Sequence, residues 1–130
     1  MNFRFWIIFI MITISPLETK AEWVRVFSID IGDLFIDSSS VKRDGNSIFY
    51  NQLVNYRTQQ SNGALSFVTN SEVNCSSLSI RDLNYQLYKK KMAKGKNFYN
   101  GNPSKKWKTY KPGTSAYLIN KLLCERVHKN

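Results

Sequence analysis

The sequence has little of what enzyme active sites are built from. Its one histidine, His128, is the third residue from the C-terminus, it has no glycine-rich phosphate loop, and its two cysteines do not form a Cys-x-x-Cys pair. A serine or cysteine nucleophile needs a base beside it, and chain ends fray, so a catalytic triad that uses His128 is disfavoured. An enzyme therefore ranks last among the functions considered, and no cofactor is expected.

Metal ligands are scarce as well. Asp30, Asp33 and Asp37 lie close together in the sequence, but their spacing matches no calcium-binding loop. With one distant histidine, Cys75 and Cys124 lack the further ligands that a zinc site needs. No metal site is expected, and Asp37 is expected to cap the serine-rich turn that follows it.

Acidic residues are few. Nine Asp and Glu stand against 19 Lys and Arg, which gives the 130 residues a formal net charge of +10. A hydrophobic fraction of 42% argues against wholesale disorder, and the length fits one domain. The charge favours an anionic partner: a polysaccharide, lipid headgroups, nucleic acid or an acidic protein.

Long hydrophobic runs are limited to a short N-terminal one. After Arg4 the run Phe5–Ile14 carries no charge, but it is shorter than the roughly 20 apolar residues that a membrane-spanning helix needs. Small residues at Thr19 and Ala21 then favour signal-peptide cleavage after Ala21. Residues 1–21 are thus predicted to be a signal peptide and residues 22–130 one mature domain, exported to the periplasm, the cell surface or the medium, without a transmembrane anchor. The alternative is an uncleaved, buried N-terminal helix.

Export decides how the two cysteines are interpreted. In an oxidising compartment two cysteines in a small domain usually pair, so Cys75 and Cys124 are predicted to form a disulfide. A free buried thiol pair or a redox site are the alternatives, and neither has support in the sequence.

The mature chain is predicted to be α+β. Short runs of β-branched and aromatic residues separated by turn signals indicate five strands, joined as an antiparallel meander, around residues 23–27, 34–36, 48–56, 65–75 and 83–87. Asp44-Gly45 marks a hairpin. Thr114 or Ser115 can cap a C-terminal helix, whose apolar stripe recurs at spacings of three and four. Cys124 lies beside that stripe, so the disulfide would tie the helix to one face of the sheet.

Positive charge is concentrated near the C-terminus. Residues 22–88 hold five basic and seven acidic residues, whereas residues 89–130 hold twelve basic residues and one acidic residue. Glycines and Pro103 predict an exposed loop over Lys94–Pro103. The candidate anion-binding residues are Lys89, Lys90, Lys91, Lys94, Lys96, Lys105, Lys106, Trp107, Lys108 and Lys111.

Two interpretations of this lysine-rich segment remain open. In the first, the lysines attract a polyanion and an aromatic side chain stacks on a base or sugar ring. Lysine lacks the planar fork of arginine, which argues against sequence-specific recognition of nucleic acid. In the second, the segment is solvated surface, and Trp107 packs back on the core.

A series of short motifs resembles the bacterial surface-adhesin E family. They are Trp23-Val24, Leu34-Phe35-Ile36-Asp37, Val41 before Asp44-Gly45-Asn46, Asn55-Tyr56, Cys75, Trp107, Pro112-Gly113-Thr114-Ser115 and Cys124. The resemblance implies an exported α+β domain with a sheet-to-helix disulfide. It also implies adhesion to host matrix or plasma proteins, without supplying an adhesive motif.

Two functions follow as hypotheses. The chain is either an exported binding protein that engages an acidic macromolecule (a polysaccharide, a matrix protein or an anionic membrane surface), or a structural, envelope-associated protein without direct binding activity.

Overall fold

The structure, a computed structural model, describes residues 20–128. Residues 1–19 of the predicted signal peptide lie outside the described residues. Within the described part, no helix has both the length and the apolar character needed to cross a membrane.

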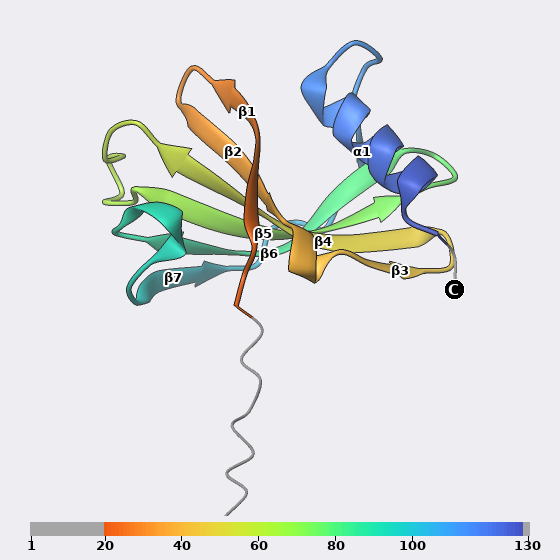
Figure 1. The fold of residues 1–130 in the computed structure, drawn as a ribbon. Coiled ribbons are helices and arrows are strands. Elements are labelled where there is room, and N and C mark those ends of the chain that lie inside the picture. The colour runs from red at the N-terminus through yellow and green to blue at the C-terminus, as the bar shows by residue number, and fades with distance from the viewer. Residues whose placement is uncertain (1–19, 129–130) are drawn as a thin grey trace, which may run out of the picture.

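The fold is one antiparallel sheet of eight strands with a single C-terminal helix (Figure 1). Six strands lie side by side in the order β1-β2-β4-β5-β6-β7, while β3 pairs with β4 and β8 pairs with β6. The strands are β1 (Trp23–Ile29), β2 (Gly32–Asp37), β3 (Lys42–Asp44), β4 (Ser47–Tyr56), β5 (Ser66–Asn74), β6 (Ser79–Tyr88), β7 (Asn97–Gly101) and β8 (Lys108–Thr109). The helix is α1 (Ser115–Arg126), and two 3₁₀ turns are η1 (Ser38–Ser40) and η2 (Lys91–Ala93).

The α+β class and the meander order were predicted correctly, but the strand count was too low. The five predicted strands are β1, β2, β4, β5 and β6. β2 and β3 pair with successive parts of the same edge of β4. β7 and β8 both pair with the outer edge of β6. The predicted loop over Lys94–Pro103 was therefore wrong at Asn97–Gly101, where pairing with β6 supplies backbone hydrogen bonds that local sequence does not reveal.

Local signals at two turns are confirmed. Gly45 has a φ of +57° between β3 and β4, a conformation that glycine adopts without steric cost. Asp37 caps η1, because its Oδ1 accepts a hydrogen bond from the Ser39 backbone N–H at 3.0 Å.

Helix α1 covers one half of one face of the sheet, and in Figure 1 it lies above the ends of β3, β4, β5 and β6. Leu123, Cys124 and Val127 pack against a core that includes Ile48 and Val73. Burying these apolar side chains holds the helix on the sheet.

Two further features fix the helix. The Cys75–Cys124 disulfide joins it to the end of β5, with 5.5 Å between the α-carbons. Arg43 on β3 donates hydrogen bonds to the carbonyl oxygens of Cys124 and Val127 at 2.9 and 2.6 Å. A cation at a helix C-terminus satisfies free carbonyl groups and complements the helix dipole. At the other end Thr114 is the N-cap, as predicted, and accepts from the Tyr117 N–H at 3.3 Å.

Candidate functional site: a lysine-rich edge of the sheet

The first group of lysines lies where the chain leaves β6, turns through η2 and enters β7. All five members are exposed: Lys89, Lys90, Lys91, Lys94 and Lys96. The turn has an uncommon backbone, because Met92 and Ala93 have φ values of +61° and +53°. Left-handed conformations at two consecutive residues with side chains are strained and need support from surrounding structure.

That support comes from two polar side chains on the face opposite α1. Asn55 accepts a hydrogen bond from the Met92 N–H at 2.7 Å, and its Nδ2 lies 2.9 Å from the Met92 sulfur. Ser66 donates to the Lys90 carbonyl at 2.6 Å and accepts from the Ala93 N–H at 3.1 Å. The turn that carries the first lysine group is thus held at its backbone, while the lysine side chains stay free to meet a ligand.

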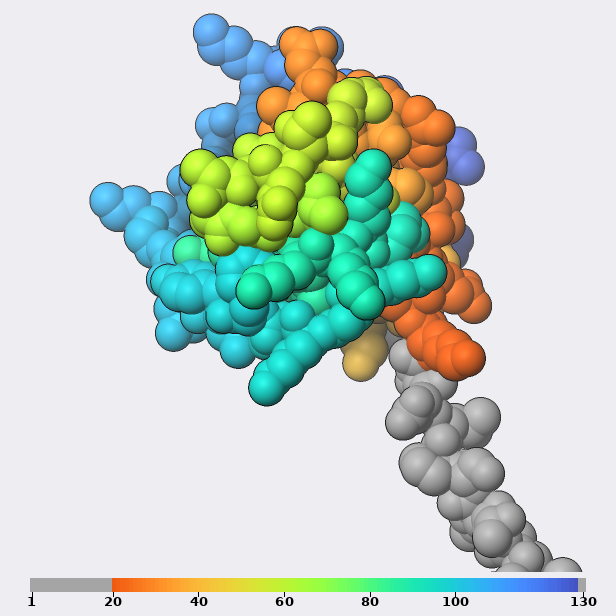
Figure 2. Space-filling model, turned by 90° about the vertical axis from the view of Figure 1, so that its left-hand side faces the viewer, coloured from red at the N-terminus to blue at the C-terminus, as the bar shows by residue number. Residues whose placement is uncertain are grey.

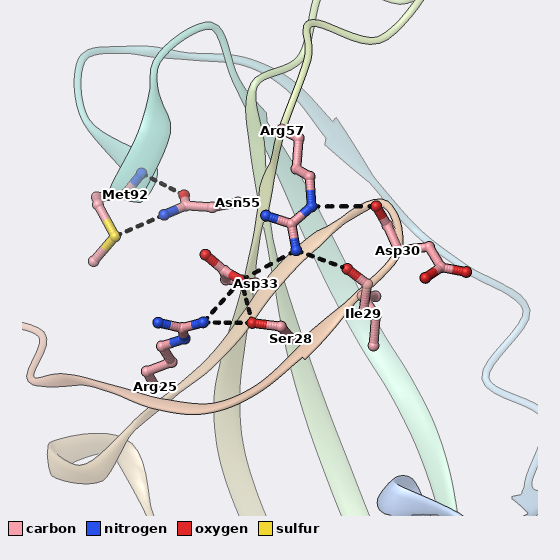
Figure 3. Close-up of polar contacts among 8 residues, drawn as sticks. All are labelled: Arg25, Ser28, Ile29, Asp30, Asp33, Asn55, Arg57 and Met92. Carbon is pink, nitrogen blue, oxygen red and sulfur yellow. Dashed lines mark hydrogen bonds and ion pairs between the residues drawn. The ribbon is translucent and has the colours of Figure 1, made fainter.

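An ion-pair network lies beside this turn (Figure 3). Asp33 accepts from Ser28 Oγ at 2.7 Å, and lies 3.5 Å from Arg25 and 3.7 Å from Arg57. The hydrogen bond from Ser28 does most to hold the pKa of Asp33 below its ordinary value, with smaller contributions from Arg25, Arg57 and Lys91. Met92 and Asn55 lie beside this network in Figure 3, so the turn that carries the first lysine group is next to it.

The second group of lysines lies at the opposite end of β6. Lys105, Lys106, Lys108 and Lys111 are exposed on the segment that leads into and out of β8. Lys108 approaches Asp82 at 4.0 Å, which among the described residues is the one ion pair made by the nine lysines. Eight lysines of this edge therefore have no acidic partner in the described structure.

Trp107 lies in the second group and is 43% exposed. The Arg81 guanidinium lies 4.5 Å from the centre of its ring, in a cation–π contact. The interpretation that Trp107 packs back on the core is not what the structure shows. At the other end, Lys89 approaches the ring of Phe98 at 5.7 Å. Each lysine group thus has a partly exposed aromatic ring next to it.

The structure divides the predicted lysine-rich segment into two groups on one edge. β7 pairs with β6 at Tyr85–Tyr88, whereas β8 pairs with β6 at Ser79 and Ile80. A strand rises about 3.3 Å per residue, so roughly 25 Å separate the two groups. In Figure 2 long side chains project from the teal segment around residue 90 and, further round, from the light-blue segment that follows β7.

A groove with several amide side chains in its lining lies next to the first group and was not predicted from the sequence. It runs over the face opposite α1, between η1 and η2, as two neighbouring hollows of about 540 and 790 Å³ that share Asp37, Asn51 and Asn70 as lining residues. Lys20 and Ala21, which precede the predicted cleavage site, also line the second hollow. The amides of Asn51, Asn70 and Gln86 are hydrogen-bonded across three strands, and Lys94 lies at the rim. The available signal was the recurrence of Asn and Gln on one parity of neighbouring strands, which gains meaning only once the register is known.

These observations define a class of protein: a disulfide-clamped α+β domain that displays a cationic edge. The chain matches the surface-adhesin protein E family over residues 23–125, and therefore belongs to that family. No curated protein matches the sequence. The family is one of surface adhesins, which indicates an adhesin-like, exported or cell-surface protein.

Solved structures of protein E from Haemophilus influenzae share the fold. The crystal structure from the non-typeable bacterium has a TM-score of 0.58 and 17% sequence identity, and the match covers 85% of this chain and 80% of that one. A second crystal form has a TM-score of 0.59 and 18% identity, with 85% and 92% covered. At this identity the likeness establishes the fold, while the target of binding has to be inferred from the chain itself.

Proposed function

We propose that this chain binds an acidic extracellular macromolecule through the two lysine groups on the β6 edge. The observation that carries the proposal is that eight of nine lysines there have no acidic partner among the described residues, while the turn bearing the first group is held in a strained conformation. Charge that is unneutralised and held in place is suited to attract an anionic ligand.

An acidic polysaccharide fits best among the possible anionic ligands. A strip of separated lysines supplies point charges to a repeating anion, and the aromatic rings of Trp107 and Phe98 lie beside them. The amide groups of the groove next to Lys94 can both donate and accept hydrogen bonds, as sugar hydroxyls require. An acidic matrix protein or an anionic membrane surface would use the charge but not the groove.

The same proposal places the protein outside the cytoplasm. Residues 1–21 would be removed as a signal peptide, and residues 22–130 would act in the periplasm, at the cell surface or in the medium.

A salt series with heparin as the acidic polysaccharide tests the proposal. Affinity should fall steeply with salt, because each contact between a lysine and an anion releases counterions. Changing Lys89, Lys90, Lys91, Lys105, Lys106 and Lys108 to Gln should abolish binding and leave the circular dichroism spectrum unchanged. Retained affinity in this variant would contradict the proposal.

A matched pair of variants separates position from total charge. Lys105→Gln with Lys106→Gln removes two charges from the second lysine group, and Lys121→Gln with Arg126→Gln removes two exposed charges from α1. The first pair should weaken heparin binding and the second should not. Equal losses would mean that net charge alone is responsible.

The alternative, an envelope-associated structural protein, predicts a different result. Such a protein would show no saturable binding to heparin and at most a weak, salt-sensitive association with vesicles of anionic lipid. Binding to the vesicles at the same affinity as to heparin would favour a membrane surface over a polysaccharide.

A further inference from the structure

The fold fixes the chain from Glu22 onward. The Glu22 backbone N–H donates to Asp37 Oδ1 at 2.9 Å, and the Glu22 carbonyl accepts from the Ser38 N–H at 3.0 Å. The Glu22 carboxylate also accepts from Ser38 Oγ at 3.1 Å. Lys20, Ala21 and Glu22 are all exposed, so it is these hydrogen bonds that fix Glu22 in place. The last residue before β1 is therefore tied to the fold on both sides of its backbone.

Asp37, the acceptor in this arrangement, is a buried carboxylate without a cation. The residue is 5% exposed, and its Oδ1 is bonded by the Glu22 N–H, the Ser39 N–H and Ser39 Oγ, all of which are neutral. Within the described residues no Lys or Arg nitrogen lies within ion-pair distance of it. Burying a carboxylate costs much free energy unless a positive charge accompanies it.

We infer that cleavage between Ala21 and Glu22 supplies the missing positive charge, so that the new N-terminus becomes the counter-ion of Asp37. Hydrolysis consumes one water, leaves a carboxylate on Ala21 and leaves an α-amine on Glu22. That amine is mostly protonated at pH 7. The nitrogen that donates to Asp37 as an amide then donates as an ammonium, in a charge-assisted hydrogen bond.

The position of the cut matters for this inference. A cut at any other bond upstream leaves the Glu22 nitrogen as a neutral amide, and a cut downstream removes Glu22. The small residues Thr19 and Ala21 favour the same bond on independent grounds. Processing would thus both release the leader and complete a partly buried ion pair in the folded domain.

The test compares chains that differ in their first residue. Protein released from a fusion so that it begins at Glu22 should unfold at higher urea concentration than protein that begins at Ala21, with about a tenfold difference in the unfolding equilibrium constant. In Asp37→Asn protein the two starts should unfold alike. Equal stability of the two starts in the Asp37 background would overturn the inference.

A second comparison leaves Asp37 in place. Acetylation of the Glu22 α-amine removes its charge, and should lower stability to about that of the chain that begins at Ala21. This comparison decides the matter if Asp37→Asn protein does not fold. Mass spectrometry of the protein exported by its native cell should give a first residue of Glu22, and any other start would also overturn the inference.

Discussion

At the residue scale, the first lysine group depends on side chains that carry no charge. Asn55 and Ser66 lie opposite each other on β4 and β5, and their hydrogen bonds hold the left-handed backbone at Met92 and Ala93. Neither residue stands out in the sequence, because an asparagine or serine in a strand has many uses. Their role in holding the turn becomes visible only in the structure, where the backbone of Met92 and Ala93 lies against them.

Replacing Asn55 therefore tests whether the turn has to be held in place. Asn55→Ala should lower the free energy of unfolding by about 1–2 kcal/mol, through loss of a partly buried hydrogen bond to the Met92 N–H. It should also weaken heparin binding, although no charge changes. Urea unfolding and heparin titration measure the two effects. Asn100→Ala, at an exposed position on β7, is the control and should change neither.

Asp33 gives a second prediction at this scale, for acid pH. Its pKa in the folded protein is below the ordinary 3.8, so its contribution to stability is complete above that value and is lost as the pH falls through the folded pKa. In a series of urea midpoints measured below pH 5, stability falls with pH along an acid limb. This fall should be smaller in Asp33→Asn than in the native protein. Asp30→Asn is the control, and an unchanged limb in Asp33→Asn would contradict the prediction.

At the element scale, α1 is the part of the fold that most needs to be tied down. Its apolar side chains are only partly covered, with Leu118 and Leu122 at 55% and 38% exposed. The helix is held instead by Leu123 and Val127, by Arg43 at its C-terminus and by the disulfide. The helix, its N-cap and its cysteine pairing could be predicted because each follows from local spacing and from the compartment.

Removal of the disulfide should be costly. The bond joins residues separated by 49 positions, for which the chain-entropy model gives about 4 kcal/mol. Cys75→Ser with Cys124→Ser should therefore lower the urea midpoint strongly and reduce helix content before the sheet unfolds, as followed by far-ultraviolet circular dichroism. The reduced native protein should behave alike, and an unchanged midpoint in both would contradict the prediction.

At the scale of the whole molecule, strand pairing decides how the charge is displayed. The lysine-rich segment is continuous in the sequence, yet β7 and β8 attach it to opposite ends of β6. A single cationic loop thus becomes two groups along one edge.

The length of the ligand should therefore matter. Heparin fragments shorter than about 25 Å can reach one group, whereas longer ones engage both and gain from the high effective concentration of the second contact. Affinity measured over a series of fragment lengths should rise sharply near that length. The rise should disappear in Lys105→Gln with Lys106→Gln, and a smooth dependence in the native protein would contradict the two-group arrangement.

The sequence by itself determined the class of fold, the order of the five main strands, the capped helix and the cysteine pair. These features depend on alternation, helical spacing and turn residues, which act over a few positions. Only the tertiary structure decided the strands β3, β7 and β8, the split of the lysines, the amide groove and the contact between Asp37 and Glu22. Each of these depends on which backbone edges and side chains meet across the sheet, and that is set by register and packing between residues far apart in the chain.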